Sequence, residues 1–234
     1  RLISFVPITE TWSAGAHAER AHAEIDQLIA DGIVPIVVGG TGLYLRSALA
    51  ELSLAPPPDP DVRARLTAEY EADPAAVRRR LELADPQRAA SIARGDRQRT
   101  VRALEIIEGS GGQNRPSNEL WASSTRHPTR LIGLSMERDA LRERIERRCA
   151  DMVARGAAKE VERADRAGAS VTARRALGFA ELLAGDEQRM VVRTRQYAKR
   201  QLTWMRRTPG VQQIDVTGAR PEDVAAKVLD RPDR

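Results

Sequence analysis

The hydrophobic pattern of the first fifty residues alternates between helical and strand character. Apolar positions recur at helical spacing from residue 15 to residue 30, and Gly32 follows as a stop signal. The next apolar run, residues 33–38, is short and β-branched, which predicts a strand buried on both faces. After the glycines that follow, residues 43–49 predict a second helix. Helix, buried strand, glycine turn and helix in this order predict a parallel α/β sheet.

The last hundred residues repeat this pattern with more charge. Short apolar runs at 131–134 and 213–216 predict two further strands. The first of them leads into a long charged segment, 137–154, which predicts a helix that ends at Gly156. We therefore expect three strands of a parallel sheet.

The segment between residues 54 and 128 differs from both ends of the chain. Four prolines, at positions 56, 57, 58 and 60, predict an extended linker. No strand pattern follows, and a glycine-rich and polar stretch, residues 109–118, ends the segment. Helices are predicted at 61–71, 74–83, 86–93 and 97–108. The expected domains are an α/β core, residues 1–55 and 127–234, and an all-helical insertion, residues 56–126.

Composition narrows the class of protein. The chain has 234 residues, of which 41% are hydrophobic, which suffices for a sizeable core. No run approaches the roughly 18 apolar residues of a membrane span, so we expect a cytoplasmic protein that contacts no membrane. A single cysteine, Cys149, excludes an internal disulfide and a cysteine-rich metal site. The three histidines are too scattered to indicate a metal site, and we expect no metal ligands among these residues.

Charge adds a local feature to this picture. The net charge is +5, and residues 188–214 contain seven arginines and lysines but no acidic residue. Such a segment fits a polyanionic partner, and it equally fits a solvated basic helix face.

The glycine turn "VVGGTGLYL", residues 37–45, joins the predicted strand to the next helix. A helix N-terminus presents unpaired N–H groups that attract anions. Gly39 and Gly40 carry no Cβ that would block a phosphate, and the Thr41 hydroxyl adds a donor. The alternative is a tight turn that binds nothing. The turn is not a Walker A loop, because Leu43 stands after the last glycine where that loop has lysine.

Three further segments place basic side chains together. They are Arg174 with Arg175 before an Ala-Leu-Gly-Phe turn; Gln98, Arg99 and Arg102 within one helical turn; and Arg193, Arg200 and Arg207 along one helix face. Each could be a solvated face or a set of ion pairs, but their combination with an anion-ready turn favours a phosphate-rich ligand. We expect Asp96 to cap the helix that carries Arg99.

Several motifs, in their order and spacing, resemble the bacterial tRNA dimethylallyltransferases. The motifs are "PIVVGGTGLYLRSAL", "DRQRTVRALE", "GLSMERDALRERIERR", "RRALGF" and "TRQYAKRQLTWMRR", and the resemblance runs from about Val6 to Val216. Members of this family move a dimethylallyl group from dimethylallyl diphosphate to the exocyclic amine of the adenosine 3′ of the anticodon. The resemblance implies a P-loop NTPase-like parallel sheet core with a helical insertion that grips the anticodon stem-loop.

The resemblance also implies roles for individual residues. Thr41 and Arg175 are the expected catalytic residues, and the diphosphate is expected against Gly39, Gly40, Thr41 and Arg175. Phe179 stands where the family usually has tyrosine, which keeps a surface for stacking but loses a hydroxyl. The expected tRNA contacts are Arg63, Gln98, Arg99, Thr100, Val101, Arg102, Arg175, Ala176, Leu177, Gly178, Phe179, Ala180, Lys199, Arg200, Gln201 and Arg206.

One part of the family pattern does not occur in this sequence. Family members begin with a strand, a Gly-Lys-Ser/Thr loop and an aspartate that serves as the general base, whereas residues 1–7 resemble a later segment. We expect Mg²⁺ as a cofactor, with its ligands in that other part. The chain by itself is therefore expected to be inactive.

The expected partners are the tRNA anticodon stem-loop and dimethylallyl diphosphate, bound by a monomer. Two alternatives to the enzyme stay open at this point. One is an inactive RNA-binding fragment of the same family. The other is a P-loop small-molecule kinase, which shares the α/β architecture and the basic clusters.

Overall fold

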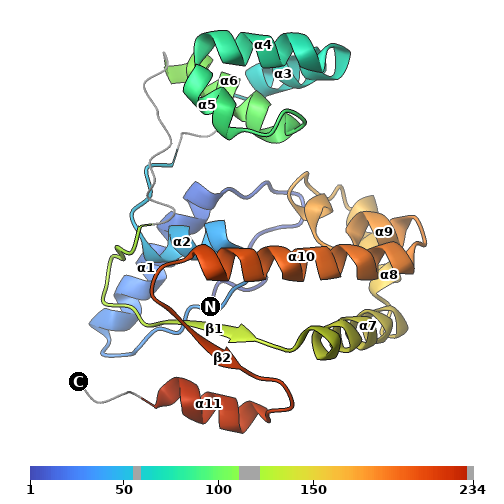
Figure 1. Ribbon diagram of the computed structural model, residues 1–234. Helices are drawn as coiled ribbons and strands as arrows, with labels where there is room; N and C mark the ends of the chain where they lie inside the picture. Colours follow the sequence, from blue (N-terminus) through green and yellow to red (C-terminus); the bar gives the residue numbers. More distant parts are fainter. Residues whose placement is uncertain (55–58, 111–121, 231–234) are drawn as a thin grey trace. The chain divides into compact units, whose positions relative to one another are not determined.

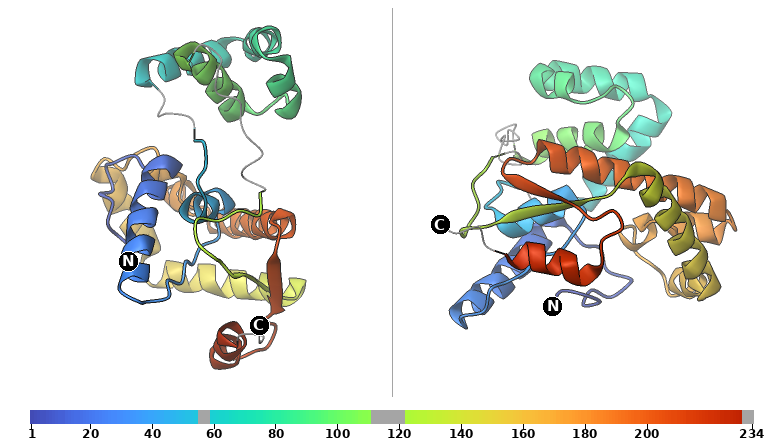
Figure 2. Two further views of the ribbon diagram at one scale, coloured as in Figure 1. Left: turned by 90° about the vertical axis from the view of Figure 1, so that its left-hand side faces the viewer. Right: turned by 60° about the horizontal axis from the view of Figure 1, so that its bottom comes forward.

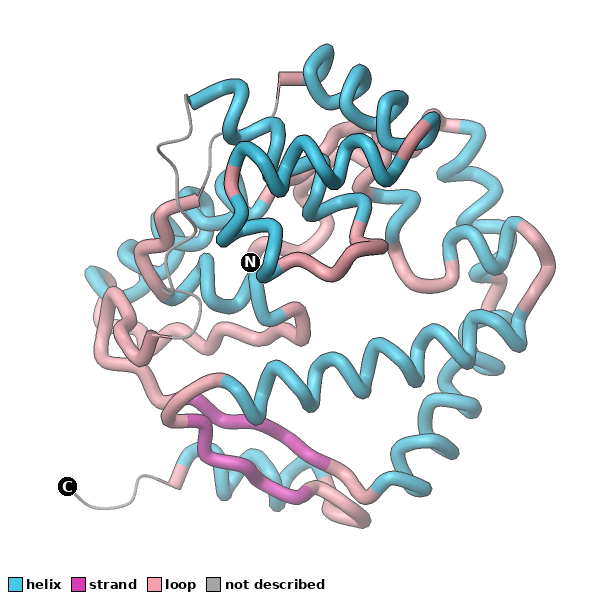
Figure 3. Tube along the Cα trace, turned by 45° about the horizontal axis from the view of Figure 1, so that its top comes forward, coloured by secondary structure: helices cyan, strands magenta, loops and turns pink. Residues whose placement is uncertain are grey.

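The computed structural model describes residues 1–54, 59–110 and 122–230. These residues form two compact units. The first combines Arg1–Leu52 with Leu120–Arg234, and the second is Ser53–Glu119. Figure 3 shows that the described chain is mostly helical, with one pair of strands. The proline linker at 55–58 and most of the polar stretch at 109–118 lie outside the described residues.

The first unit is built around two parallel strands. Strand β1 (Leu131–Ser135) pairs with β2 (Val211–Asp215), with Leu131 opposite Val211 and Ser135 opposite Asp215. Helix α10 lies on one side of this pair and α11 on the other (Figures 1 and 2). The helices of the unit are α1 (Ala14–Ala30), α2 (Gly42–Leu49), α7 (Arg138–Ala154), α8 (Ala157–Arg166), the 3₁₀ turn η2 (Ala173–Arg175), α9 (Phe179–Leu183), α10 (Glu187–Arg207) and α11 (Pro221–Leu229).

Local sequence accounts for where these helices begin. The side chains of Ser13, Glu137 and Asp186 accept backbone N–H groups in the first turns of α1, α7 and α10. Ile145 and Cys149 of α7 pack with residues of α9 and α10 in a buried cluster. This packing fixes the direction of α10, which carries the basic segment.

The strand predicted at residues 33–38 is not formed in the described chain. Residues 33–38 belong to no helix or strand, and within the described chain only β1 and β2 are paired strands. A strand requires the backbone groups of a neighbour, and no described segment offers them to residues 33–38. Val34, Ile36 and Val38 are instead 69%, 73% and 87% exposed.

This exposed apolar segment is expected to promote association of the chain at high protein concentration. Ile36→Lys should lower concentration-dependent association, measured by light scattering, with little change in unfolding temperature. Leu83→Lys is the matched control, because Leu83 is 86% exposed but lies on a helix. An equal reduction by both substitutions would contradict the role of the extended segment.

The two ends of the insertion are tied together inside the first unit. The Arg126 backbone N–H donates to the carbonyl of Leu49 at 2.8 Å. The Arg126 guanidinium donates to both Asp26 oxygens, at 3.2 and 3.0 Å, and to Glu51 at 2.6 Å. His127 Nε2 lies 2.7 Å from Asp26, and these bonds hold the pKa of Asp26 below its usual value. The chain thus leaves and re-enters the unit at one clamped point.

The second unit is a small helical bundle. Its helices are α3 (Pro60–Ala72), α4 (Pro74–Ala84), α5 (Pro86–Ser91) and α6 (Arg97–Ser110). The first three each begin with proline directly after a capping aspartate, an arrangement suited to a helix start. Leu66, Leu81 and Leu104 are fully buried and form its core. All four helices agree with the sequence prediction to within three residues at each end.

Among the described residues, no helix has both the length and the apolar character that a membrane crossing requires.

Candidate active site

The glycine turn leads directly into α2. Thr41 is the residue before the helix, in an extended conformation, and its side chain makes no capping bond. Its hydroxyl lies 2.8 Å from the hydroxyl of Tyr197 on α10. The turn is therefore joined to the basic helix through its one polar side chain.

Close packing against α10 explains two of the glycines. A Cβ on Gly40 would lie 1.8 Å from Nε2 of Gln201, and one on Gly42 would lie 2.0 Å from the Trp204 ring. The lack of a Cβ at Gly40 was predicted to admit a phosphate, whereas in the structure the side chain of Gln201 lies in that space. The missing side chains allow one face of α10 to contact the turn.

Gly42→Ala is expected to destabilise this contact by about 2 kcal/mol, because a methyl group would overlap the indole. The free energy of unfolding in urea measures the effect. Gly109→Ala is the matched control, since a Cβ at this helical position meets nothing within 4 Å. If both variants unfold alike, the packing role of Gly42 is wrong.

Arg175 ends η2 and is exposed. Burial raises the pKa of Tyr44, and the positive charge of Arg175 opposes that rise, which places Arg175 within electrostatic reach of α2. Within the described residues, no acceptor takes a hydrogen bond from its guanidinium. Among the described residues, the Arg175 guanidinium therefore keeps its charge without a hydrogen-bonded acceptor, within electrostatic reach of Tyr44 on α2.

The loop after Arg175 is held from inside the unit. Gly178 has a φ of +90°, a conformation that favours glycine, and its N–H donates to Glu181 at 3.1 Å. Phe179 is only 5% exposed, and the Arg174 guanidinium lies 5.7 Å from its ring centroid. The expected stacking surface at Phe179 is therefore part of the core. Ala176 and Ala180 remain exposed, and Leu177 is half-buried.

Glu181 anchors this loop to α10. Its side chain is 2% exposed and accepts a hydrogen bond from Arg193. Burial opposes the charged carboxylate, but the bonds from Arg193 and the Gly178 N–H outweigh it and lower the pKa of Glu181. Arg193 thus forms an ion pair, which was one of the two alternatives that the sequence left open for the basic side chains of this helix. Lys199, Arg200 and Arg206 are exposed, and the Arg200 guanidinium lies 5.8 Å from the Tyr197 ring centroid.

The predicted tRNA contacts at the start of α6 differ in exposure: two of these residues are exposed and two are buried. Gln98 and Arg99 are exposed at the start of α6, which Asp96 caps as expected by accepting the Arg99 N–H at 3.0 Å. Thr100 and Val101 are 0% and 5% exposed, because their side chains face the core of the bundle. These two side chains are structural in this arrangement, and the described residues offer the Thr100 hydroxyl no hydrogen-bond partner.

A buried glutamate binds the other two arginines of the insertion that were predicted to contact tRNA. Glu105, with a side chain 2% exposed, accepts two bonds from Arg63, at 2.5 and 2.8 Å, and one from Arg102 at 3.1 Å. Both guanidinium groups are thereby fixed at one place. Neither Glu105 nor Glu181 was identified from the sequence, because a single glutamate in a helical pattern carries no sign that it will be buried.

Known proteins of one family are similar to this chain in sequence and in fold. The family model described as IPP transferase matches residues 1–208. The tRNA dimethylallyltransferase of Thermobifida fusca is 41% identical, over 90% of this chain and 69% of that protein. The chain belongs to the IPP transferase family. The tRNA dimethylallyltransferase of Thioalkalivibrio sulfidiphilus is 37% identical, over 97% of this chain and 76% of its own length.

Solved structures of IPP transferases agree with this assignment. The tRNA isopentenylpyrophosphate transferase of Bacillus halodurans matches with a TM-score of 0.64 and 29% identity, covering 97% of this chain and 75% of that one. A eukaryotic dimethylallyltransferase acting on tRNA matches with a TM-score of 0.67 and 21% identity, which supports the fold alone. The predicted family and the P-loop NTPase-like α/β fold class are confirmed.

Proposed function

We propose that this IPP transferase chain takes part in tRNA dimethylallyl transfer, with the N6 amine of the adenosine 3′ of the anticodon as acceptor. The observation that carries the proposal is the family match over residues 1–208, together with relatives named tRNA dimethylallyltransferase. The reaction forms a bond from the amine nitrogen to the allylic carbon and breaks the bond from that carbon to the diphosphate.

The chemistry assigns distinct tasks to the described residues. The diphosphate gains negative charge as its bond to carbon breaks, so a fixed positive group beside it lowers the barrier. Arg175 supplies this charge, and the hydroxyl of Thr41, held by Tyr197, orients the turn that faces the reacting groups. The adenine must leave the base stack to reach the donor, at a cost of a few kcal/mol that contacts in the pocket offset.

Mg²⁺ is part of the proposal only as an ion that accompanies the diphosphate. The described residues do not gather three His, Cys, Asp or Glu side chains that could hold a metal.

The anticodon stem-loop is the proposed RNA partner, bound by a monomer in the cytoplasm. Exposed basic side chains on α10, namely Lys199, Arg200 and Arg206, suit phosphate contacts, as do Gln98 and Arg99 on the insertion. Such contacts set the position of the RNA more than they read its sequence.

Binding of the stem-loop is expected to depend strongly on salt. Four phosphate contacts, from Lys199, Arg99, Arg200 and Arg206, give a fall of about 50-fold in affinity between 50 and 200 mM salt. Fluorescence anisotropy with a labelled stem-loop measures this slope. A nearly flat dependence would exclude the phosphate contacts.

Transfer itself is tested with the protein expressed from its complete reading frame. Labelled dimethylallyl diphosphate should label an anticodon stem-loop, and a stem-loop with the target adenosine replaced should stay unlabelled. Tight binding without transfer would favour the inactive RNA-binding alternative, and phosphorylation of a small molecule would favour the kinase.

A further inference from the structure

A buried carboxylate in the second unit fixes the direction of an arginine side chain. The side chain of Glu105 on α6 is 2% exposed, whereas that of Arg63 on α3 is 47% exposed. The Nε and Nη2 atoms of Arg63 each donate to one oxygen of Glu105, at 2.5 and 2.8 Å. The Arg102 guanidinium donates to the second of these oxygens at 3.1 Å. Arg63 is therefore held at two points along one edge, while about half of its side chain stays accessible.

Other contacts join α3 to α6 without this ion pair. Leu66 and Leu104 are fully buried in the core of the bundle, and Arg65 of α3 donates to Glu108 of α6. A buried carboxylate adds little net stability, because its removal from water offsets much of its attraction to a cation. What Glu105 adds to the bundle is a fixed direction for the guanidinium of Arg63.

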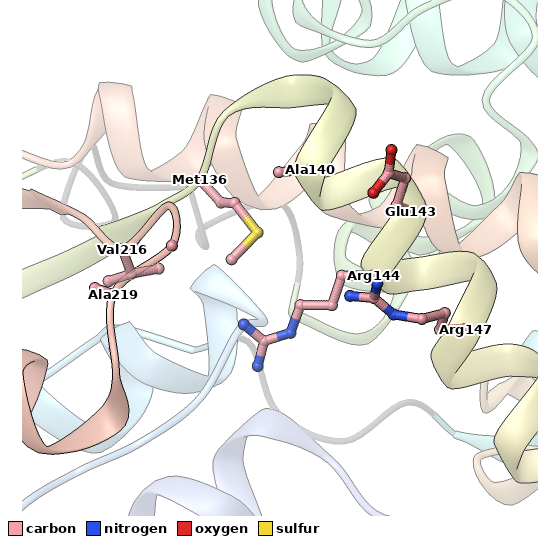
Figure 4. Close-up of a pocket in the computed structure, with 8 residues that line it drawn as sticks. Met136, Ala140, Glu143, Arg144, Arg147, Val216 and Ala219 are labelled. Carbon is pink, nitrogen blue, oxygen red and sulfur yellow. The ribbon is translucent and has the colours of Figure 1, made fainter.

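Two other arginines of the chain show the contrast. Arg144 and Arg147 of α7 line a hollow beside Met136 and Val216, as Figure 4 shows. Among the described residues, no carboxylate lies within ion-pair distance of either guanidinium. Such side chains lose rotamer freedom when a ligand binds to them, whereas Arg63 has already lost it in the folded chain.

The geometry of Arg63 suits an unpaired base better than a phosphate. A phosphate binds best to two parallel N–H groups on one edge of a guanidinium, and Glu105 occupies the edge formed by Nε and Nη2. The carboxylate also offsets the positive charge that would attract a phosphate. The two flat faces of a guanidinium take no part in these bonds, and unpaired RNA bases stack on such faces.

We propose that Glu105 is a positioning residue for RNA binding. It holds the guanidinium of Arg63 in one plane, on which an unpaired base of the RNA loop stacks. Arg63 then contacts a base, and this contact is separate from the exposed side chains that are expected to bind phosphates. The choice of RNA as ligand rests on the proposed function, whereas the plane of the guanidinium is set by its bonds to Glu105.

Fluorescence anisotropy with the full chain and a labelled anticodon stem-loop tests this role. Glu105→Gln should weaken binding about tenfold, although the loss of a negative charge would by itself tighten binding to RNA. Glu108→Gln is the matched control, because Glu108 lies on the same helix and also pairs with two arginines, Arg65 and Arg80. It removes the same charge, and its affinity should equal or exceed that of the wild type. An equal loss in both variants would overturn the proposal.

Arg63→Gln should weaken binding as much as Glu105→Gln does, although the two substitutions change the net charge in opposite directions. The double variant should show no further loss, because both substitutions act on one contact. The slope of affinity against salt should stay at the wild-type value, since no phosphate contact is lost. A slope reduced by about one contact in Arg63→Gln would show that Arg63 binds a phosphate, and the stacking would then be wrong.

A series of stem-loops, each lacking one base of the loop, identifies the stacked base. For one member of the series, the wild type and Glu105→Gln should bind equally well, and a constant difference across the series would exclude stacking. Circular dichroism should show the same helical content for all variants. If Glu105→Gln is partly unfolded, the half-exposed position of Arg63 allows Arg63→Gln to carry the test by itself.

The outcomes separate this role from the proposed function. Stem-loop binding with these differences but no dimethylallyl transfer would refute the proposed function and leave the role of Glu105 standing. Transfer together with equal stem-loop binding by the wild type and both variants would overturn the role of Glu105 and leave the proposed function standing. A wild-type chain that binds no stem-loop would contradict both.

Discussion

Arg175→Gln is expected to lower the turnover of dimethylallyl transfer by about 100-fold or more. Its guanidinium is exposed and takes part in no hydrogen bond among the described residues, so its loss removes charge stabilisation of the leaving diphosphate without removing a structural contact. Single-turnover kinetics with labelled dimethylallyl diphosphate, on the protein from the complete reading frame, measure the effect. The free energy of unfolding should stay within about 0.5 kcal/mol of the wild type.

Arg189→Gln is the matched control for this substitution. Arg189 lies in the first turn of α10, is exposed, and loses the same charge from the same unit. Its turnover should equal that of the wild type. If both variants lose turnover equally, the effect is one of net charge, and Arg175 is not at the site.

Glu181→Ala is expected to destabilise the protein by about 3 kcal/mol. The substitution removes the partner of the half-exposed Arg193 guanidinium and leaves the buried Gly178 N–H without its acceptor. Denaturation in urea measures the loss, and Glu187→Ala, at an exposed position in the first turn of α10, is the control. A loss below about 1 kcal/mol would show that Glu181 does not hold the loop.

The same carboxylate predicts the sign of a pH effect. The pKa of Glu181 is lowered in the folded state, so its contribution to stability is present above the unfolded pKa and disappears as the pH falls through the lower folded value. The difference in unfolding free energy between wild type and Glu181→Ala should therefore shrink under acid conditions. A difference that stays constant with pH would contradict the ion pair with Arg193.

The sequence predicted most helices well because their signals are local. A proline after an aspartate starts α3, α4 and α5, and buried apolar residues at helical spacing continue α3 and α4. The strand expected at residues 33–38 was wrong in the described chain because pairing depends on a neighbour, which an apolar run does not supply. The same run would be a strand wherever a partner edge is available.

The candidate site shows the same limit at the level of side chains. The sequence identified the glycine turn, Arg175 and the basic helix, but not that Gln201 and Trp204 occupy the space beside Gly40 and Gly42. Segments more than 150 residues apart meet there, as in the bond between Thr41 and Tyr197. Residue type and spacing carry no information about such contacts.

The hydrogen bond between Leu49 and Arg126 makes the attachment of the insertion independent of the residues within the insertion. Both ends are joined by bonds that belong to the first unit, including those from Arg126 to Asp26 and Glu51. A short glycine-rich linker in place of the second unit, Ser53–Glu119, would keep each of these bonds. The core can therefore accept helical modules of different lengths at this place, because changes in the length of the insertion leave its point of attachment intact.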